Sequence, residues 1–175
     1  HDVAERMYLR GAELGNKEPE PRTHPRSLWD YRTHHPLPRI NARRGNRDVA
    51  LFHMESARRA LDADTAMARQ QERFYPYLAG YVALYANDLR TAEAEFTRAL
   101  AMQGNDRDPF QNLLLAMTYE KMNQQAKARE FYRKAYDMAT AHNPPAVHTR
   151  PLARKWLGLP FFINGATSER VLASG

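Results

Sequence analysis

An internal repeat of 36 residues constrains the fold of this chain more than any other feature of its sequence. Two stretches each carry a small residue, an aromatic residue four positions later and another small residue three positions after that. In both stretches an asparagine lies five positions before the first small residue, and a further small residue lies twelve positions before it. The matching positions are Gly80, Asn87, Ala92, Phe96 and Ala99 in the first stretch and Ala116, Asn123, Ala128, Tyr132 and Ala135 in the second.

This pattern is typical of paired helices. From position 48 to about 157, apolar residues recur with helical spacing, and no segment shows the two-residue alternation of a half-buried strand. Two antiparallel helices joined by a tight turn need small residues where their backbones approach, and an aromatic ring can fill the wedge beside them. We therefore expect an all-α fold in which Gly80 and Ala92 allow close approach and Phe96 fills the wedge. The same argument applies to Ala116, Ala128 and Tyr132.

The arrangement resembles the tetratricopeptide repeat family, in which each repeat has a small residue midway along its first helix and a small–aromatic–small trio on its second. On this resemblance, one repeat spans about 73–106 and the next about 109–142. A partial repeat at about 45–70 is indicated by Gly45 and Asn46 followed by Ala50, Met54 and Ala57. The implied fold is a short α-solenoid of antiparallel helix pairs, closed by a helix at 145–157.

The chain also departs from the family pattern. Pro76 and Asn112 stand where the family has an early tryptophan, and Gly104 and Thr140 stand where it has a terminal proline. The resemblance is therefore close over about 70 residues and looser over about 110.

The N-terminal region has a different composition. Residues 1–16 are expected to form a short helix that ends at Gly15. Residues 17–47 contain five prolines, and residues 21–47 within them carry the whole net charge of +6, whereas the other 148 residues are neutral. Because proline interrupts helices and removes backbone donors, we expect an extended arm here. The arm residues expected to contact a partner are Arg22, Arg26, Trp29, Tyr31, Arg32, Arg39, Arg43 and Arg44. At the other end, residues 158–175 are expected to form a tail.

The resemblance also implies a binding surface, because in this family the first helices of successive pairs line a concave face that receives peptides. Carried over to this chain, the face consists of Phe74, Tyr77, Tyr81, Leu84, Tyr85, Phe110, Leu113 and Met117. The basic and amide residues with which chaperone-binding members hold a carboxylate are missing here, so the expected ligand is an apolar or aromatic protein segment. Any single tyrosine of this stripe could instead belong to the core.

Several classes of chemistry find no support in the sequence. The chain has no cysteine, which excludes disulfides and thiolate metal sites, and no apolar run long enough to cross a bilayer. It has no phosphate-binding glycine loop, nucleophile elbow or zinc-binding histidine pair with a glutamate. His24, His34 and His35 lie in the arm without a set of acidic neighbours. We therefore expect no enzymatic activity, cofactor or metal.

Three functions stay open. The leading one is a protein–protein interaction scaffold that assembles through its arm, tail and stacked helical faces, as a homo-oligomer, a self-polymerising filament or part of a larger complex. The second is an accessory subunit or monomeric adaptor that binds an apolar peptide segment. The third is a nucleic-acid-binding module, which the neutral body of the chain argues against. The first residue, His1, fits signal-peptide removal or a trimmed expression product, and we favour an extracytoplasmic protein.

Overall fold

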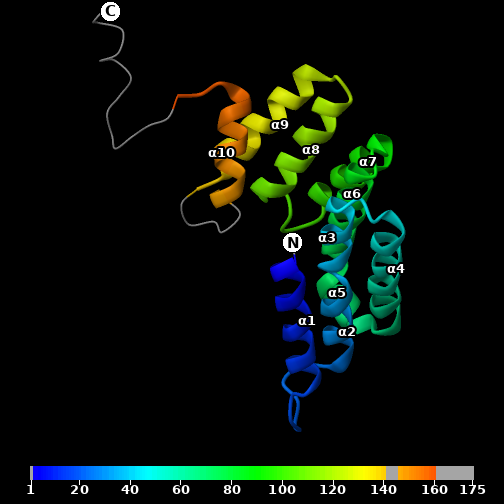
Figure 1. The fold of residues 1–175 in the computed structure, drawn as a ribbon. Helices are drawn as coiled ribbons and strands as arrows, with labels where there is room; N and C mark the ends of the chain where they lie inside the picture. Colours follow the sequence, from blue (N-terminus) through cyan, green and yellow to red (C-terminus); the bar gives the residue numbers. More distant parts are fainter. Residues whose placement is uncertain (1, 141–145, 161–175) are drawn as a thin grey trace, which may run out of the picture.

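The computed structural model describes residues 2–140 and 146–160, and all regular secondary structure in these residues is helical (Figure 1). The prediction of an all-α fold is therefore confirmed. Within the described residues, no helix combines the length and the apolar character needed to cross a membrane. The elements are α1 (Asp2–Asn16), α2 (Arg26–His34), α3 (Leu37–Arg43), α4 (Arg47–Ala63), α5 (Thr65–Gln71), the 3-10 turn η1 (Glu72–Phe74), α6 (Tyr75–Tyr85), α7 (Leu89–Ala101), α8 (Pro109–Lys121), α9 (Gln125–Met138) and α10 (Ala146–Leu157).

Three helix pairs, α3–α4, α6–α7 and α8–α9, are joined by the same backbone turn. Its first residue is left-handed in each pair, with φ of +79° at Gly45, 60° at Asn87 and 59° at Asn123. Glycine and asparagine tolerate this conformation best, which explains their presence five positions before Ala50, Ala92 and Ala128. The amide of the next residue donates to a carbonyl five residues earlier, at 2.9 Å in all three turns, which is the Schellman arrangement that ends a helix.

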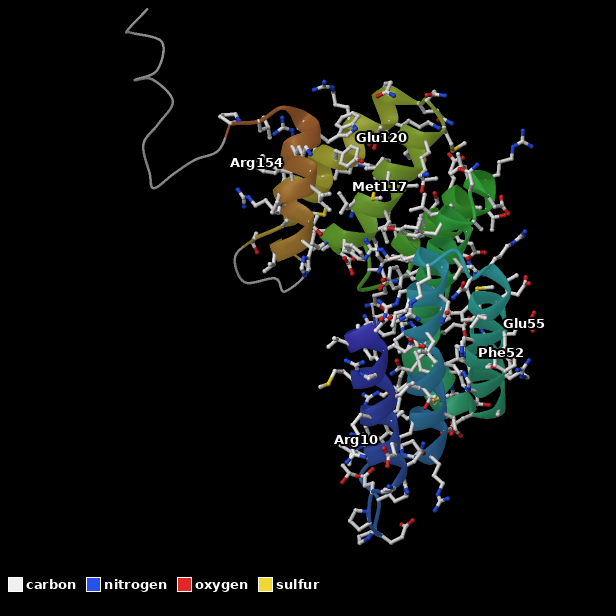
Figure 2. The ribbon with its side chains drawn as sticks, viewed as in Figure 1. Arg10, Phe52, Glu55, Met117, Glu120 and Arg154 are labelled. Carbon is white, nitrogen blue, oxygen red and sulfur yellow. The ribbon has the colours of Figure 1, made fainter. Side chains whose placement is uncertain are left out.

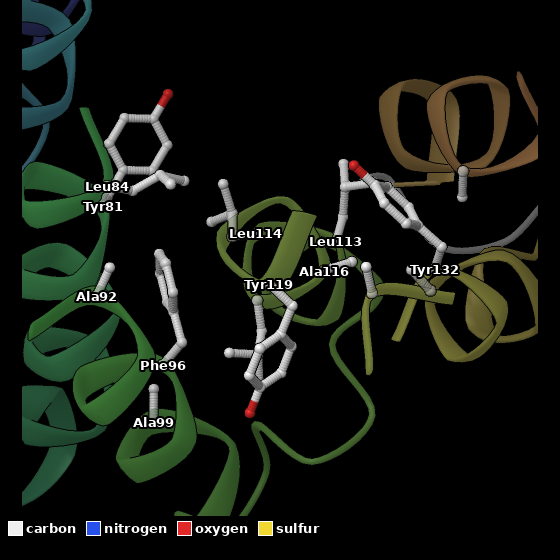
Figure 3. Packing of buried hydrophobic residues seen from close by; sticks show 14 of the residues in the cluster. Tyr81, Leu84, Ala92, Phe96, Ala99, Leu113, Leu114, Ala116, Tyr119 and Tyr132 are labelled. Atoms are coloured by element: carbon white, nitrogen blue, oxygen red, sulfur yellow. The ribbon is translucent and has the colours of Figure 1, made fainter. Parts of the chain in front are cut away.

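The repeated small and aromatic residues form the core between the paired helices. Phe96 is fully buried between α6 and α7, and its ring lies against Gly80 so closely that a Cβ there would be 2.8 Å from ring carbons. Figure 3 shows Phe96 between Ala92 and the side chains of α8. All eight residues predicted to pack the repeats are buried, namely Gly80, Ala92, Phe96, Ala99, Ala116, Ala128, Tyr132 and Ala135.

The prediction of an extended arm over 17–47 is wrong, because most of this segment is helical. α2 and α3 are separated by His35 and Pro36 alone, and both of these residues keep helical φ and ψ. A proline is tolerated in the first turn of a helix, where its missing donor has no partner to lose, and Pro36 and Pro38 both lie at the start of α3. Tyr31, Leu37 and Ile40 of this segment are buried, and they complete the packing around α4 and α6.

The arm residues expected to contact a partner make most of their contacts within the chain. Arg22 donates to the carbonyl of Gly15 at 2.8 Å and so satisfies the C-terminal end of α1. Trp29 lies directly over Gly15, and Arg32 lies over the Trp29 ring. Arg44 pairs with Glu5 at 2.6 Å and with Asp2. Arg26 is exposed, which leaves it accessible at the surface.

α6 connects the two halves of the molecule. Its Leu78 and Val82 pack with α2, α3 and α4, whereas Tyr81 and Leu84 belong to the larger apolar cluster that continues through α7, α8, α9 and α10. At the C-terminal end α10 packs on α9 and α8. Leu159 packs against the same cluster, and residues 161–175 of the predicted tail lie outside the described residues.

Candidate functional site

Half of the predicted binding face belongs to the core. Tyr77, Tyr81 and Leu84 are buried because α6 is enclosed by α3 and α4 on one side and by α7 and α8 on the other, and Leu113 of α8 is buried in the same apolar cluster. The ring of Tyr77 meets that of Phe110 edge-on, with centroids 6.4 Å apart, and Tyr81 stacks on Tyr85 at 4.8 Å. The tyrosine stripe therefore joins helices to one another and is not an open surface.

Three of the predicted face residues, Phe74, Tyr77 and Phe110, line a hollow of about 310 Å³ between η1, α6, α8 and α10, which we call the central hollow. The polar residues of its wall are Arg39, Asp108, Gln111 and His148. Asp108 is engaged as the N-cap of α8, where its carboxylate accepts from the amides of Phe110 at 2.8 Å and Gln111 at 3.2 Å. The side-chain oxygen of Gln111 is buried without a partner.

Two further predicted residues, Leu113 and Met117, line a hollow of about 330 Å³ between α8 and α10, the C-terminal hollow. Met117 and Glu120 lie on the part of α8 that faces this hollow (Figure 2). Across it, the rings of Tyr132 and Trp156 stack with centroids 4.3 Å apart, and the Tyr132 hydroxyl donates to Glu120 at 2.6 Å. Burial, and then the neighbouring Glu120, raise the pKa of Tyr132, so it stays a hydrogen-bond donor.

Arg39 was expected to contact a partner as part of the arm, yet it lies inside the fold at the edge of the central hollow. Its Nη1 donates to the Tyr77 hydroxyl at 2.9 Å, and its guanidinium lies over the Tyr77 ring. Burial alone would lower the pKa of Arg39, but Tyr77 raises it, and the side chain stays charged. Among the described residues no carboxylate lies within ion-pair distance of it.

A third hollow, of about 420 Å³, lies between α1, α2 and η1, and we call it the N-terminal hollow. Its wall includes Tyr31 of α2, His35 between α2 and α3, and Arg39 of α3, which are spaced by four residues along the chain. The four-residue spacing of these three residues is visible in the sequence. It predicts a shared helical face only if the segment is helical, and the prolines of the segment predict an extended arm there. Among the residues that the structure describes, no group of three or more histidine, aspartate or glutamate side chains could hold a metal ion.

Comparison with known proteins identifies no family whose binding sites could be compared with these hollows. No protein-family model, no curated protein and no solved structure matches the chain.

Proposed function

We propose that the chain is a non-enzymatic protein-binding scaffold of the tetratricopeptide type, which holds an extended segment of a partner protein along α8. The repeated turns and the small–aromatic packing support the family resemblance. Residues 17–47 pack on α4 and α6 of the same chain, so contact between this segment and a neighbouring molecule is not required for binding. The leading form of the proposal is accordingly the adaptor rather than the arm-linked assembly.

One observation supports this proposal most directly: the central and C-terminal hollows open along the same helix. Phe110 lines the first and Met117 the second, and they are seven residues apart on α8. At about 1.5 Å of rise per residue the hollows are separated by roughly 10 Å. A peptide in the polyproline II conformation has three residues per turn and rises about 3.1 Å per residue, so two apolar side chains three residues apart point to the same side and would reach both hollows.

The test is selection of short peptides on the intact chain, followed by fluorescence anisotropy with the selected peptides. We expect sequences with two apolar or aromatic residues three positions apart. Phe110→Glu and Met117→Glu should each weaken binding about tenfold or more, because a charge would have to be buried in an apolar hollow. Val49→Glu, an equivalent change on exposed α4, should leave binding unchanged. Failure to select any peptide, or binding indifferent to both hollow variants, would refute the adaptor.

Self-association is a second candidate, supported by the two ends of the molecule. Ala153 of α10 is fully buried, as is Ala116 of α8, so α10 packs like the first helix of a further pair. Its Val147 and Leu152 are 72% and 53% exposed, and no second helix covers α10 among the described residues. At the other end α1 exposes Val3, Met7 and Leu14. Contact between two different ends need not close, and would build an open filament.

Sedimentation of the intact chain over a wide concentration range tests this candidate. Assembly that is lost in both Met7→Glu and Leu152→Glu would support end-to-end contact. A species of 20.2 kDa at every concentration would eliminate it without affecting the peptide-binding proposal.

A further inference from the structure

The N-terminal hollow contains a concentration of buried polar atoms without partners. Five such side-chain atoms occur in the described residues, and three of them belong to residues that line this hollow: Tyr31 Oη, His35 Nε2 and Arg39 Nε. Nearly all buried polar groups in folded proteins are paired, with protein, water or ligand. Three unpaired groups spaced by four residues from α2 to α3 therefore indicate a site that is built to receive polar atoms.

The rest of the wall is apolar and aromatic. Trp29 and Phe74 contribute rings, and Met7 and Tyr8 of α1 form the outer edge. The volume of about 420 Å³ falls within the range of small-molecule sites, roughly 300–1,000 Å³. Met7 and Tyr8 are 68% and 47% exposed, so the hollow meets solvent at this edge and a ligand can enter there.

The charge of the hollow is one-sided. Arg32 and Arg39 both line it, the guanidinium of Arg32 lies over the Trp29 ring, and no aspartate or glutamate contributes to the wall. A ligand held here would therefore bear a negative charge. Arg39 Nε and the Tyr31 hydroxyl supply hydrogen-bond donors, and the two oxygens of a carboxylate can accept from both.

His35 adds one acceptor to these donors. Burial, and then the charge of Arg39, lower the pKa of His35 to about 3, whereas a hydrogen bond to the backbone of Phe74 raises it slightly. The imidazole is thus neutral near pH 7, and because the bond to the Phe74 carbonyl uses its other nitrogen, Nε2 is left as an acceptor. A hydroxyl close to the carboxylate would donate to it.

We propose that the N-terminal hollow binds a small hydroxycarboxylic acid with an apolar tail. The carboxylate accepts from Arg39 and Tyr31, the hydroxyl donates to His35, and the tail lies against Trp29 and Phe74. This site adjoins the central hollow, with which it shares Arg39 and Phe74, but it uses a different ligand class.

The probe is 3-hydroxydecanoate, with binding followed by the fluorescence of Trp29 in a Trp156→Phe background, where Trp29 is the sole tryptophan. We expect saturable binding, at least about tenfold tighter than that of the methyl ester, which has no charge to pair with Arg39. Decanoate, which lacks the donor for His35, should bind about threefold or more weaker than 3-hydroxydecanoate. An ester that binds equally well, a decanoate that binds equally well, or no saturation at millimolar ligand would overturn the proposal.

Two variants locate the ligand. Tyr31→Phe removes only a hydroxyl that has no partner, so the fold should be retained while affinity falls about threefold or more. Arg39→Met should abolish measurable binding. Arg43→Met is the matched control, because Arg43 lies one turn further along α3, over Tyr85 and away from the hollow. The affinity of this variant for 3-hydroxydecanoate should equal that of the parent chain. If Tyr31→Phe, folded by circular dichroism, binds as tightly as the parent, the site is wrong.

Discussion

Gly80 and Gly11 are both glycines inside helices, and their surroundings predict opposite effects of the same substitution. Glycine costs a helix about 1 kcal/mol relative to alanine, so Gly11→Ala, with no atom within 4 Å of the new Cβ, should stabilise the fold by up to that amount. At Gly80 the new Cβ would lie 2.8 Å from the fully buried Phe96 ring, and overpacking costs about 1–3 kcal/mol. In urea denaturation, the unfolding free energy of Gly11→Ala should therefore rise and that of Gly80→Ala should fall, relative to the parent chain. Stabilisation by Gly80→Ala would contradict the packing described for α6 and α7.

His35 predicts a pH dependence of stability. Its pKa is lowered from 6.5 to about 3 on folding, by burial and then by Arg39, so the unfolded chain binds a proton that the folded chain does not. The stability contributed by the neutral form is complete above pH 6.5 and is lost as pH falls towards 3. Between pH 6.5 and 5 the loss is about 2 kcal/mol for this one group. The unfolding free energy of His35→Asn should fall less steeply over this interval; equal slopes would show that His35 titrates in the folded chain.

The turns that join the paired helices are the elements most open to test. Asn123 holds a left-handed φ of 59°, which glycine adopts freely and alanine adopts at a cost of about 1 kcal/mol. Asn123→Ala should therefore lower the unfolding free energy by about that amount, while Asn123→Gly at the same position should be neutral within a few tenths of a kcal/mol. Chemical denaturation resolves the two. Equal behaviour of both variants would mean that the α8–α9 turn does not depend on its backbone conformation.

The helix α1 and the pairs α6–α7 and α8–α9 could be predicted from the sequence, whereas α2 and α3 could not, for reasons that lie in particular residues. Asn87 and Asn123 indicate turns because few residues other than asparagine and glycine adopt a left-handed φ. The buried alanines that follow them indicate close packing of two helices. Pro36 and Pro38 suggested an extended chain, because their position in the first turn of a helix is known only once the helix start is known. The prediction that Arg39 contacts a partner is wrong for the same reason. The N-terminal hollow could not be predicted either, because Arg39 is part of its wall.

At the scale of the whole molecule, each helix packs mainly on helices that are close to it along the chain, and within the described residues α6 alone contributes to all three apolar clusters. In an arrangement of this kind the free energy of unfolding is approximately a sum of contributions from individual helix pairs and their interfaces. A destabilising substitution at one end should therefore leave the stability of the other end unchanged. Trp156→Ala removes the ring stacked on Tyr132. We expect faster amide hydrogen exchange in α9 and α10 and unchanged exchange in α4, with α6 and α8 the slowest of all.

The control for this experiment is Phe52→Ala, which deletes an aromatic ring that is 56% exposed on α4 and should leave every helix beyond α4 unaffected. The contrasting result is informative about the same packing. If Trp156→Ala accelerated exchange in α4 as much as in α10, the clusters on the two sides of α6 would unfold together. The chain would then be a single cooperative bundle, and the case for repeated, stackable units would fail on energetic grounds even though the turns repeat in geometry.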